Sequence, residues 1–105
     1  TASKVGEVSD DERVIFLLKI QRDRLTTRIK ELERKEAELT AKVKSLLKDG
    51  QKDQAKFQLG KLKGFQSRKK DLNIKVDFID KQSNSIEQAR DDANFTDVLK
   101  DSNKV

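Results

Sequence analysis

Apolar residues recur along this chain at the seven-residue spacing of helices that pack against another helix. In the first half, leucine stands at one position of the repeat and isoleucine or valine at the other. These residues are Leu18, Leu25, Leu32, Leu39 and Leu46, together with Ile15, Ile29 and Val43. Arg22 and Glu36 interrupt the stripe, and burying either charge without a partner costs much desolvation energy. We therefore expect these two side chains either to reach out to solvent or to mark contacts with another molecule.

A second stripe with the same spacing follows in the other half of the chain. Its members are Ala55, Leu62 and Val76 at one position, Phe65, Leu72, Ile79, Ile86 and Ala93 at the other, and Lys69 as a polar interruption. Because each stripe needs a partner, the sequence predicts an all-α fold, a long antiparallel two-helix hairpin. A turn at residues 48–52 then pairs residues whose numbers add to about 101, such as Leu25 with Val76.

Turn and capping residues indicate where the helices begin and end. Ser9 and Glu12 have the spacing of a capping box, which predicts a helix start. Asp49-Gly50 predicts a helix end, because glycine adopts the left-handed conformation at no steric cost. Asp53 then offers a side-chain oxygen to cap the second helix.

These signals divide the chain into three parts. We expect a flexible N-terminal lead-in at residues 1–8, a helical hairpin at residues 9–90 (helix one 9–48, turn 49–52, helix two 53–90), and a further segment at residues 91–105. In the last part, Phe95, Val98 and Leu99 form an apolar face with a new phase. This face predicts a short third helix, either bent away or continuous with the second as a helical extension. We also expect the natural protein to continue beyond Val105.

The composition argues against catalysis. The chain has no cysteine and no histidine, so it lacks the usual zinc ligands, cysteine nucleophiles and the imidazole that serves as a general base near pH 7. We expect no enzyme activity, no cofactor and no metal site. No stretch reaches the roughly 18 apolar residues of a membrane span, so contact with a membrane would be at its surface.

Charge is segregated along the chain. Residues 48–75 carry 9 basic and 3 acidic side chains, whereas residues 76–105 carry 4 and 7. Two sets of basic residues run beside the apolar stripe of the second helix. They are Lys56, Lys63 and Lys70 on one edge, and Lys61, Arg68 and Lys75 on the other. Their charged groups can lie among anionic lipid headgroups, or the residues can simply form a solvated face.

Nucleic acid is another anionic partner to consider. A basic helical surface can neutralise phosphates. The chain has no tyrosine or tryptophan, and Phe65 belongs to the apolar stripe, so the basic residues are not interleaved with aromatic side chains that could stack on bases. We therefore expect no nucleic-acid binding.

Two further features have both a functional and a structural interpretation. Gly60 and Gly64 have a G-x-x-x-G spacing, which can let another backbone approach, but on an exposed helix the pair simply lowers helix stability. Phe16, Phe57 and Phe78 lie off the apolar stripes. They are either docking points for a partner or the surface that a third helix covers, and we favour the second interpretation.

Two segments resemble a known family. Residues 14–25, VIFLLKIQRDRL, and residues 46–56, LLKDGQKDQAK, resemble the ESCRT-III proteins, also called charged multivesicular body proteins. The chain looks most like their nucleating subunit, which links ESCRT-II to the main filament-forming subunit. The resemblance covers about residues 10–105 and includes the capped start and the basic second helix.

This resemblance implies a function and a location. Family members bind acidic endosomal membranes from the cytoplasm through basic residues of the helical hairpin, and assemble with other ESCRT-III subunits in multivesicular body sorting and membrane scission. On this basis the candidate membrane-binding residues are Lys56, Lys61, Lys63, Arg68, Lys69, Lys70 and Lys75. The candidate ESCRT-II contact is the first half of helix one, with Val14, Ile15, Leu18, Arg22 and Leu25. The acidic stretch after residue 77 suits pairing with basic surface on neighbouring subunits, and self-association is also expected.

The chain departs from the family pattern at several points. Residues 1–105 open with Thr1-Ala2-Ser3, so the glycine on which the nucleating subunit is typically myristoylated cannot be read from them, and they do not include the acidic C-terminal region of such proteins; we expect a trimmed chain to explain both. Gly60 and Gly64 stand where charged residues are expected. The alternative function is an antiparallel coiled-coil adaptor that binds protein partners only.

Overall fold

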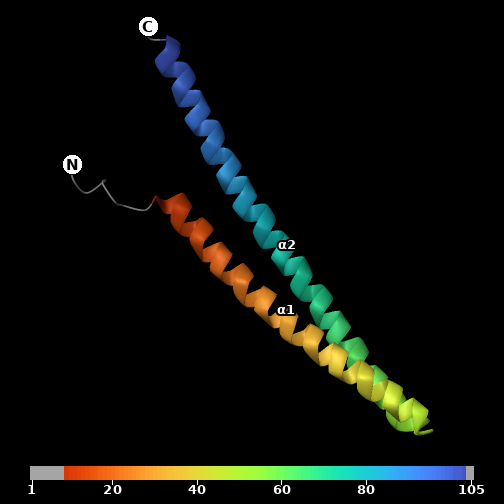
Figure 1. Ribbon diagram of the computed structural model, residues 1–105. Helices are drawn as coiled ribbons and strands as arrows, with labels where there is room; N and C mark the ends of the chain where they lie inside the picture. Colours follow the sequence, from red (N-terminus) through yellow and green to blue (C-terminus); the bar gives the residue numbers. More distant parts are fainter. Residues whose placement is uncertain (1–8, 104–105) are drawn as a thin grey trace. The chain divides into compact units, whose positions relative to one another are not determined.

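The described part of the chain consists of two long helices. A computed structural model describes residues 9–103, which form α1 (Asp10–Lys48) and α2 (Lys52–Asn103) joined by a short turn (Figure 1). No strand occurs within residues 9–103, so the predicted all-α class is confirmed. The predicted lead-in at residues 1–8 and the last two residues of the chain lie outside the described residues.

The start of α1 follows the predicted capping chemistry in part. The Glu12 backbone N–H donates a hydrogen bond to the Ser9 hydroxyl oxygen at 3.1 Å, and the Arg13 N–H donates to the Ser9 carbonyl at 3.0 Å. These bonds satisfy N–H groups that have no partner within the helix. The Glu12 carboxylate instead lies 3.4 Å from the Arg90 guanidinium. Only the Ser9 half of the capping box is thus formed.

The turn between the helices is a glycine-terminated helix end. Gly50 has a φ of 78°, in the left-handed region. The Gln51 N–H donates to the Leu46 carbonyl at 2.8 Å, and the Gly50 N–H donates to the Leu47 carbonyl at 3.1 Å. This pair of bonds defines a Schellman motif, which satisfies carbonyls that the helix leaves open. The predicted helix stop at Gly50 is confirmed.

The second helix begins at Lys52, one residue before its predicted capping residue Asp53. The Ala55 N–H donates to the Gln51 carbonyl at 3.0 Å, so α2 begins at Lys52 and Asp53 lies within its first turn. The proposed capping role of Asp53 is therefore wrong. Its carboxylate still lies near the positive end of the helix dipole, which favours a negative charge there.

The chain divides into two compact units. One unit combines residues 9–22 with residues 77–103, and the other consists of residues 23–76 and contains the turn. In each unit a segment of α1 pairs with a segment of α2. The segments of residues 23–76 are antiparallel because a short turn joins them. In the other unit Glu12 pairs with Arg90 and Arg22 with Asp80, so partner numbers fall as α1 numbers rise, as in antiparallel helices.

The turn-containing unit, residues 23–76, has a narrow apolar core. Its buried residues are Ile29, Leu32, Val43 and Ala55. The other stripe residues of this unit are half-buried; they are Leu25, Leu39, Leu46, Leu62, Phe65, Leu72 and Val76. All of these residues stand at positions that the seven-residue pattern selects. We call these positions the seam. A buried leucine or valine contributes about 1.5–3 kcal/mol, so the hydrophobic effect along the seam holds the two segments together.

Two of the predicted polar interruptions of the seam meet in this unit. The Lys69 ammonium lies 3.0 Å from Glu36 Oε1 and donates a hydrogen bond to Glu36 Oε2 at 3.3 Å. The contact with Oε1 is an ion pair without hydrogen-bond geometry. The two side chains are 29% and 16% exposed, so the pair is largely desolvated. Glu36 therefore does not reach out to solvent, and its partner within the chain is Lys69.

The other unit has a shorter seam, which is bordered by ion pairs between the two helices. Ile15, Ile79 and Ser83 are buried, and Leu18 and Ile86 are half-buried. The ion pairs join Glu12 to Arg90 at 3.4 Å, Lys19 to Glu87 at 3.8 Å and Arg22 to Asp80 at 3.6 Å. Arg22, the remaining predicted interruption, thus has a carboxylate partner across the seam. Exposed pairs of this kind contribute little to stability but favour one register.

Beyond Arg90 the apolar side of α2 changes. Ala93, which the pattern assigns to the seam, is exposed, so this assignment is wrong. Phe95, Val98 and Leu99 are 65%, 61% and 49% exposed. The helix itself continues to Asn103 without a break, so the described residues show an extension of α2 and no separate third helix.

The Glu36–Lys69 pair makes a stability prediction. Lys69→Leu leaves the Glu36 carboxylate without a cation in the seam, and we expect unfolding to become easier by about 1–3 kcal/mol. Glu36→Leu/Lys69→Leu removes both charges and should restore most of that loss. Denaturant unfolding followed by circular dichroism measures both. Lys19→Ala, at an exposed pair, is the control and should cost less than about 0.5 kcal/mol. Equal losses in the single and double seam variants would contradict this account.

The glycines make a second prediction. No atom lies within 4 Å of a Cβ built on Gly60 or Gly64, so Gly60→Ala and Gly64→Ala should each stabilise α2 by about 0.5–1 kcal/mol. Gly50→Ala should destabilise by about 1–2 kcal/mol, because its positive φ strains any residue with a Cβ. Thermal unfolding distinguishes the two signs. A destabilising Gly60→Ala in the isolated protein would show that the glycine has a packing role.

Candidate functional site

The seven basic residues predicted to bind membrane fall into three groups on α2. Lys69 lies in the seam as the partner of Glu36, and the other six are exposed. Of these, Lys61, Arg68 and Lys75 each directly precede a seam residue, whereas Lys56, Lys63 and Lys70 each directly follow one. Successive helical residues are rotated by about 100°, so residues on the two sides of a seam residue are about 160° apart around α2. The predicted set is therefore two separate surfaces and one structural ion pair.

Three residues of α1 belong with the first of these columns. Arg28, Lys35 and Lys42 are exposed, and each directly precedes a seam residue of α1. In an antiparallel pair these positions of both helices flank the seam on the same side. We call the combined set the basic edge. It consists of Arg28, Lys35, Lys42, Lys61, Arg68 and Lys75. Sequence analysis missed the α1 members, although their seven-residue spacing was a usable signal.

The register of the seam sets like charges opposite one another. Glu36 and Lys69 are in contact, and their residue numbers add to 105. The numbers of Lys42 and Lys61 add to 103, as do those of Lys35 and Arg68, so these basic residues fall in nearly the same register. Like charges across a helix pair repel, so they destabilise the pairing of the two helices. Within the described residues no ion pair involves any of the six. The basic edge is thus open to an external anion.

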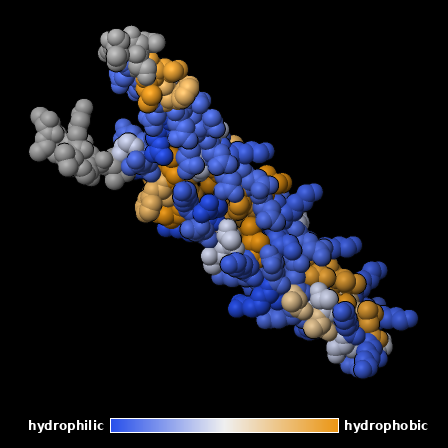
Figure 2. Space-filling view, turned by 45° about the horizontal axis from the view of Figure 1, so that its top comes forward, coloured by the Kyte–Doolittle hydropathy of each residue, from blue (hydrophilic) through white to orange (hydrophobic). Residues whose placement is uncertain are grey.

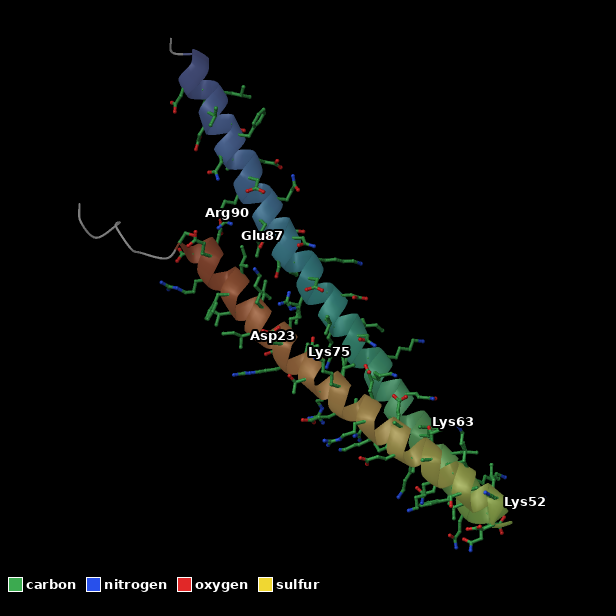
Figure 3. All side chains as sticks on the ribbon, in the orientation of Figure 1. Asp23, Lys52, Lys63, Lys75, Glu87 and Arg90 are labelled. Carbon is green, nitrogen blue, oxygen red and sulfur yellow. The ribbon has the colours of Figure 1, made fainter. Side chains whose placement is uncertain are left out.

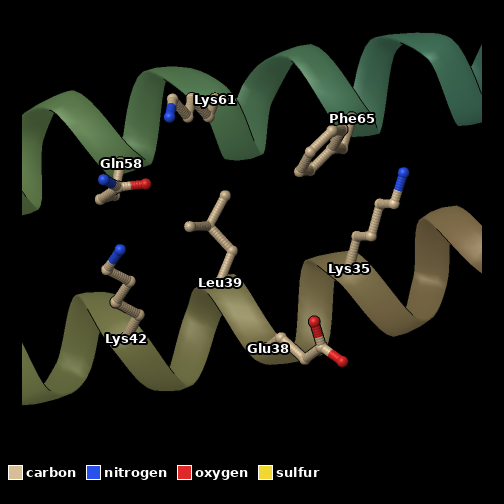
Figure 4. Close-up of a pocket in the computed structure, with 7 residues that line it drawn as sticks. All are labelled: Lys35, Glu38, Leu39, Lys42, Gln58, Lys61 and Phe65. Atoms are coloured by element: carbon tan, nitrogen blue, oxygen red, sulfur yellow. The ribbon is translucent and has the colours of Figure 1, made fainter.

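A shallow groove lies in the middle of the basic edge. It has a volume of about 300 Å³ and lies between α1 and α2 within residues 23–76. Its lining residues are Lys35, Glu38, Leu39 and Lys42 from α1, and Gln58, Lys61 and Phe65 from α2. Figure 4 shows the Leu39 side chain pointing toward α2, with Lys35 and Lys42 on either side of it along α1. The groove therefore has an apolar floor and a rim of ammonium groups.

One rim residue is held over an aromatic ring. The Lys61 ammonium lies 4.9 Å from the centroid of the Phe57 ring, one helical turn earlier in α2. A cation–π contact of this kind contributes about 0.5–1 kcal/mol at an exposed site. Phe57 itself is 63% exposed, so it orients Lys61 without burying it.

The second column lies outside the groove. Lys56, Lys63 and Lys70 are exposed, and Leu59 beside them is 39% exposed. Figure 3 labels Lys63 on α2. Basic side chains beside exposed apolar residues suit a membrane surface, where the stems lie along apolar groups and the charges stay among headgroups. Figure 2 shows such apolar patches among charged side chains on the face it displays.

Charge differs between the two units. Residues 23–76 contain 16 basic and 8 acidic side chains, a net charge of +8. The described residues of the other unit, 9–22 and 77–103, contain 6 basic and 10 acidic ones, a net charge of −4. The overall charge of +5 conceals this difference. Any attraction for an anionic surface belongs to residues 23–76.

The residues predicted to contact ESCRT-II lie in different environments. Ile15 is buried, Leu18, Arg22 and Leu25 are half-buried in the seam, and Val14 is 45% exposed. The seam thus occupies most of this set. Two apolar residues outside the predicted set are more open, since Phe16 is 62% and Leu17 is 58% exposed.

Phe57 and Phe78 are also exposed, at 63% and 60%. The sequence favours a third helix that packs over Phe16, Phe57 and Phe78, but the described residues contain no such helix. Gly60 and Gly64 likewise face open space. No helix within the described residues is long and apolar enough to span a membrane, and those residues contain no cluster of metal-ligating side chains.

Comparison with known proteins identifies the family of this chain. The model of one protein family, Snf7, matches residues 15–105, from the first buried seam residue through the extension of α2. No curated protein and no solved structure matches the chain. Snf7-family proteins are the ESCRT-III proteins, structural and non-enzymatic proteins that associate peripherally with membranes and act in membrane remodelling. Because the match covers most of its length, this chain belongs to the Snf7 family of ESCRT-III proteins.

Proposed function

We propose that this chain is the helical core of the ESCRT-III subunit that nucleates assembly on endosomal membranes. In this role it binds acidic membrane from the cytoplasm, binds ESCRT-II, and assembles with other ESCRT-III subunits in multivesicular body sorting and membrane scission. Family membership supports the general role in membrane remodelling and assembly. The membrane surface, the subunit type and the ESCRT-II contact rest on the residues described below.

The observation that carries the membrane proposal is the basic edge together with the second column of α2. Nine exposed basic residues lie on these two surfaces of one unit with a net charge of +8. Each lysine or arginine near an anionic leaflet contributes about 1 kcal/mol, and the effect falls off within a Debye length. Several such residues acting together can hold a protein that has no membrane-spanning helix among its described residues. Lys69 is left out of this surface, because it is the partner of Glu36.

The ESCRT-II contact belongs at the start of α1. In the paired form of this unit, the surface open to a partner is apolar and consists of Val14, Phe16 and Leu17. Exposed aromatic and aliphatic side chains that lie close together are typical anchors of a protein interface. Ile15 stays beneath them in the seam and would support the contact from within the helix pair.

The acidic end of α2 suits assembly with other subunits. Asp91, Asp92, Asp97 and Asp101 are exposed on the extension, beside the open Phe95. Complementary charge guides association and selects partners more than it adds affinity. A neighbouring subunit with a basic surface fits this end. The alternative function, a coiled-coil adaptor that binds protein only, has no use for the basic edge.

Membrane binding can be tested by charge reversal on α2. Lys63→Glu/Arg68→Glu/Lys70→Glu places acidic groups on both basic surfaces, and we expect it to lower co-sedimentation with phosphatidylserine vesicles by about tenfold or more. Binding of the unaltered protein should rise with the anionic lipid fraction and fall with salt. Circular dichroism should show unchanged helicity.

The matched control for this test reverses three exposed basic residues in the other unit. Arg13→Glu/Lys81→Glu/Lys100→Glu changes the net charge by the same amount but leaves residues 23–76 intact. It should retain most of the vesicle binding. If the unaltered protein does not bind at any lipid charge, the adaptor function is correct. If both triple variants lose binding equally, net charge and not this surface determines it.

The ESCRT-II contact is tested by truncating its exposed side chains. Phe16→Ala/Leu17→Ala should weaken binding to purified ESCRT-II by about tenfold, since anchor residues of an interface each contribute about 1–2 kcal/mol or more. Binding can be measured by calorimetry. Leu47→Ala/Phe57→Ala removes comparable exposed apolar groups elsewhere and should leave affinity unchanged. Equal affinity of both double variants would exclude the start of α1 as the contact.

A further inference from the structure

We infer that the groove at the centre of the basic edge is a binding site for a multiply phosphorylated anion, which bridges α1 and α2. This inference deepens the proposed membrane function, and rests on it only for the membrane source of the ligand. The chemical class is an inositol ring or similar small scaffold that carries several phosphates. It would occupy the space among Lys35, Lys42 and Lys61.

The geometry of the groove supports a small polyanion. Lysine side chains from two helices line one space, with Lys35 and Lys42 on α1 and Lys61 on α2 (Figure 4). A volume of about 300 Å³ is at the low end of small-molecule sites, which range over about 300–1,000 Å³. Lysine binds phosphate as a point charge with three donors. Three lysines around one space therefore favour a ligand with several phosphates over one with a single charge.

The remaining lining residues limit the pose of such a ligand. Leu39 and Phe65 form a half-buried floor that can contact the carbon atoms of a ring, and the Gln58 amide can donate to a phosphate oxygen. Glu38 brings one negative charge to the rim, so phosphates should lie toward the lysines and away from it. The groove is thus more specific than a uniform basic surface.

The like charges of the basic edge give a second reason for a bridging anion. The register of the Glu36–Lys69 pair matches Lys42 with Lys61 and Lys35 with Arg68, and three of these four residues line the groove, so helix pairing brings basic side chains to one side. An anion that contacts both helices replaces this repulsion with attraction. It binds the paired form and not the separated helices, and so it should stabilise the fold.

Two sources supply this chemistry. The phosphates could belong to the headgroup of a phosphoinositide in a membrane, or to a free inositol phosphate in solution. A headgroup would orient residues 23–76 with the basic edge toward the bilayer. A free ligand would occupy the groove without a membrane. The two sources are separated by measuring each in turn.

The first experiment uses inositol hexakisphosphate as a free probe. We expect the unaltered protein to bind it in calorimetry and to show a higher melting temperature in its presence. Lys35→Gln/Lys42→Gln, on the α1 side of the groove, should weaken binding by about tenfold or more, because each charged hydrogen bond contributes about 1.5–3 kcal/mol. Lys30→Gln/Lys44→Gln removes the same charge from exposed α1 positions outside the groove, and should change affinity less than about threefold. Equal losses in the two variants would overturn the site.

The second experiment compares vesicles of equal total charge that contain either phosphatidylinositol bisphosphate or phosphatidylserine. A headgroup site predicts stronger binding to the phosphoinositide vesicles, and loss of this preference in Lys35→Gln/Lys42→Gln. Because Lys35 and Lys42 belong to the basic edge, binding of that variant to phosphatidylserine vesicles should also fall, but the ratio of phosphoinositide to phosphatidylserine binding should fall toward one. Absence of phosphatidylserine binding in the unaltered protein would refute the proposed membrane surface alone. A soluble-ligand site is indicated if the free probe binds but vesicles show no preference, whereas no binding in either arm refutes the inference.

Discussion

The structure depends on one constraint, the register of the antiparallel seam. Apolar residues at seven-residue spacing supply the attraction between α1 and α2, but they are too similar to select one alignment. Charged residues within and beside the seam make the alignments differ in energy. Glu36 meets Lys69 at 3.0 Å in one unit, and Arg22 meets Asp80 at 3.6 Å in the other. A shift by one heptad would leave Glu36 in the seam without a cation, so the desolvation penalty opposes it.

The same register that satisfies the seam creates the unsatisfied basic edge. When Glu36 and Lys69 pair, basic residues of α1 and α2 become neighbours on one side, and Lys35, Lys42 and Lys61 line a single groove. The protein thus combines a neutralised interior with an uncompensated positive border. This arrangement is unfavourable for an isolated helix pair and favourable for one that meets anions. If an anionic partner binds there, as we propose, it would stabilise residues 23–76, which suits a protein of a membrane-remodelling family.

The two units also differ in charge. The positive unit contains the turn and the basic edge, whereas the negative unit contains the exposed start of α1 and the acidic extension of α2. The chain therefore has chemically different surfaces, a basic one within residues 23–76 and apolar and acidic ones within residues 9–22 and 77–103. Because α2 is a single helix from Lys52 to Asn103, these surfaces need no additional domain. The long helix is the common scaffold for a basic half and an acidic half.

The sequence by itself determined the helices, the glycine stop at Gly50 and nearly every seam residue, because heptad spacing and capping are local properties. It could not determine that Glu36 would find Lys69, since the partners are 33 residues apart and only the paired register brings them together. For the same reason it placed Lys69 among the surface cations and missed Arg28, Lys35 and Lys42, which join the α2 cations only across the seam. It also assigned Ala93 to the seam, although the partner helix no longer covers that position. Local patterns fix which face of a helix is apolar, whereas the tertiary structure decides what that face and its borders meet.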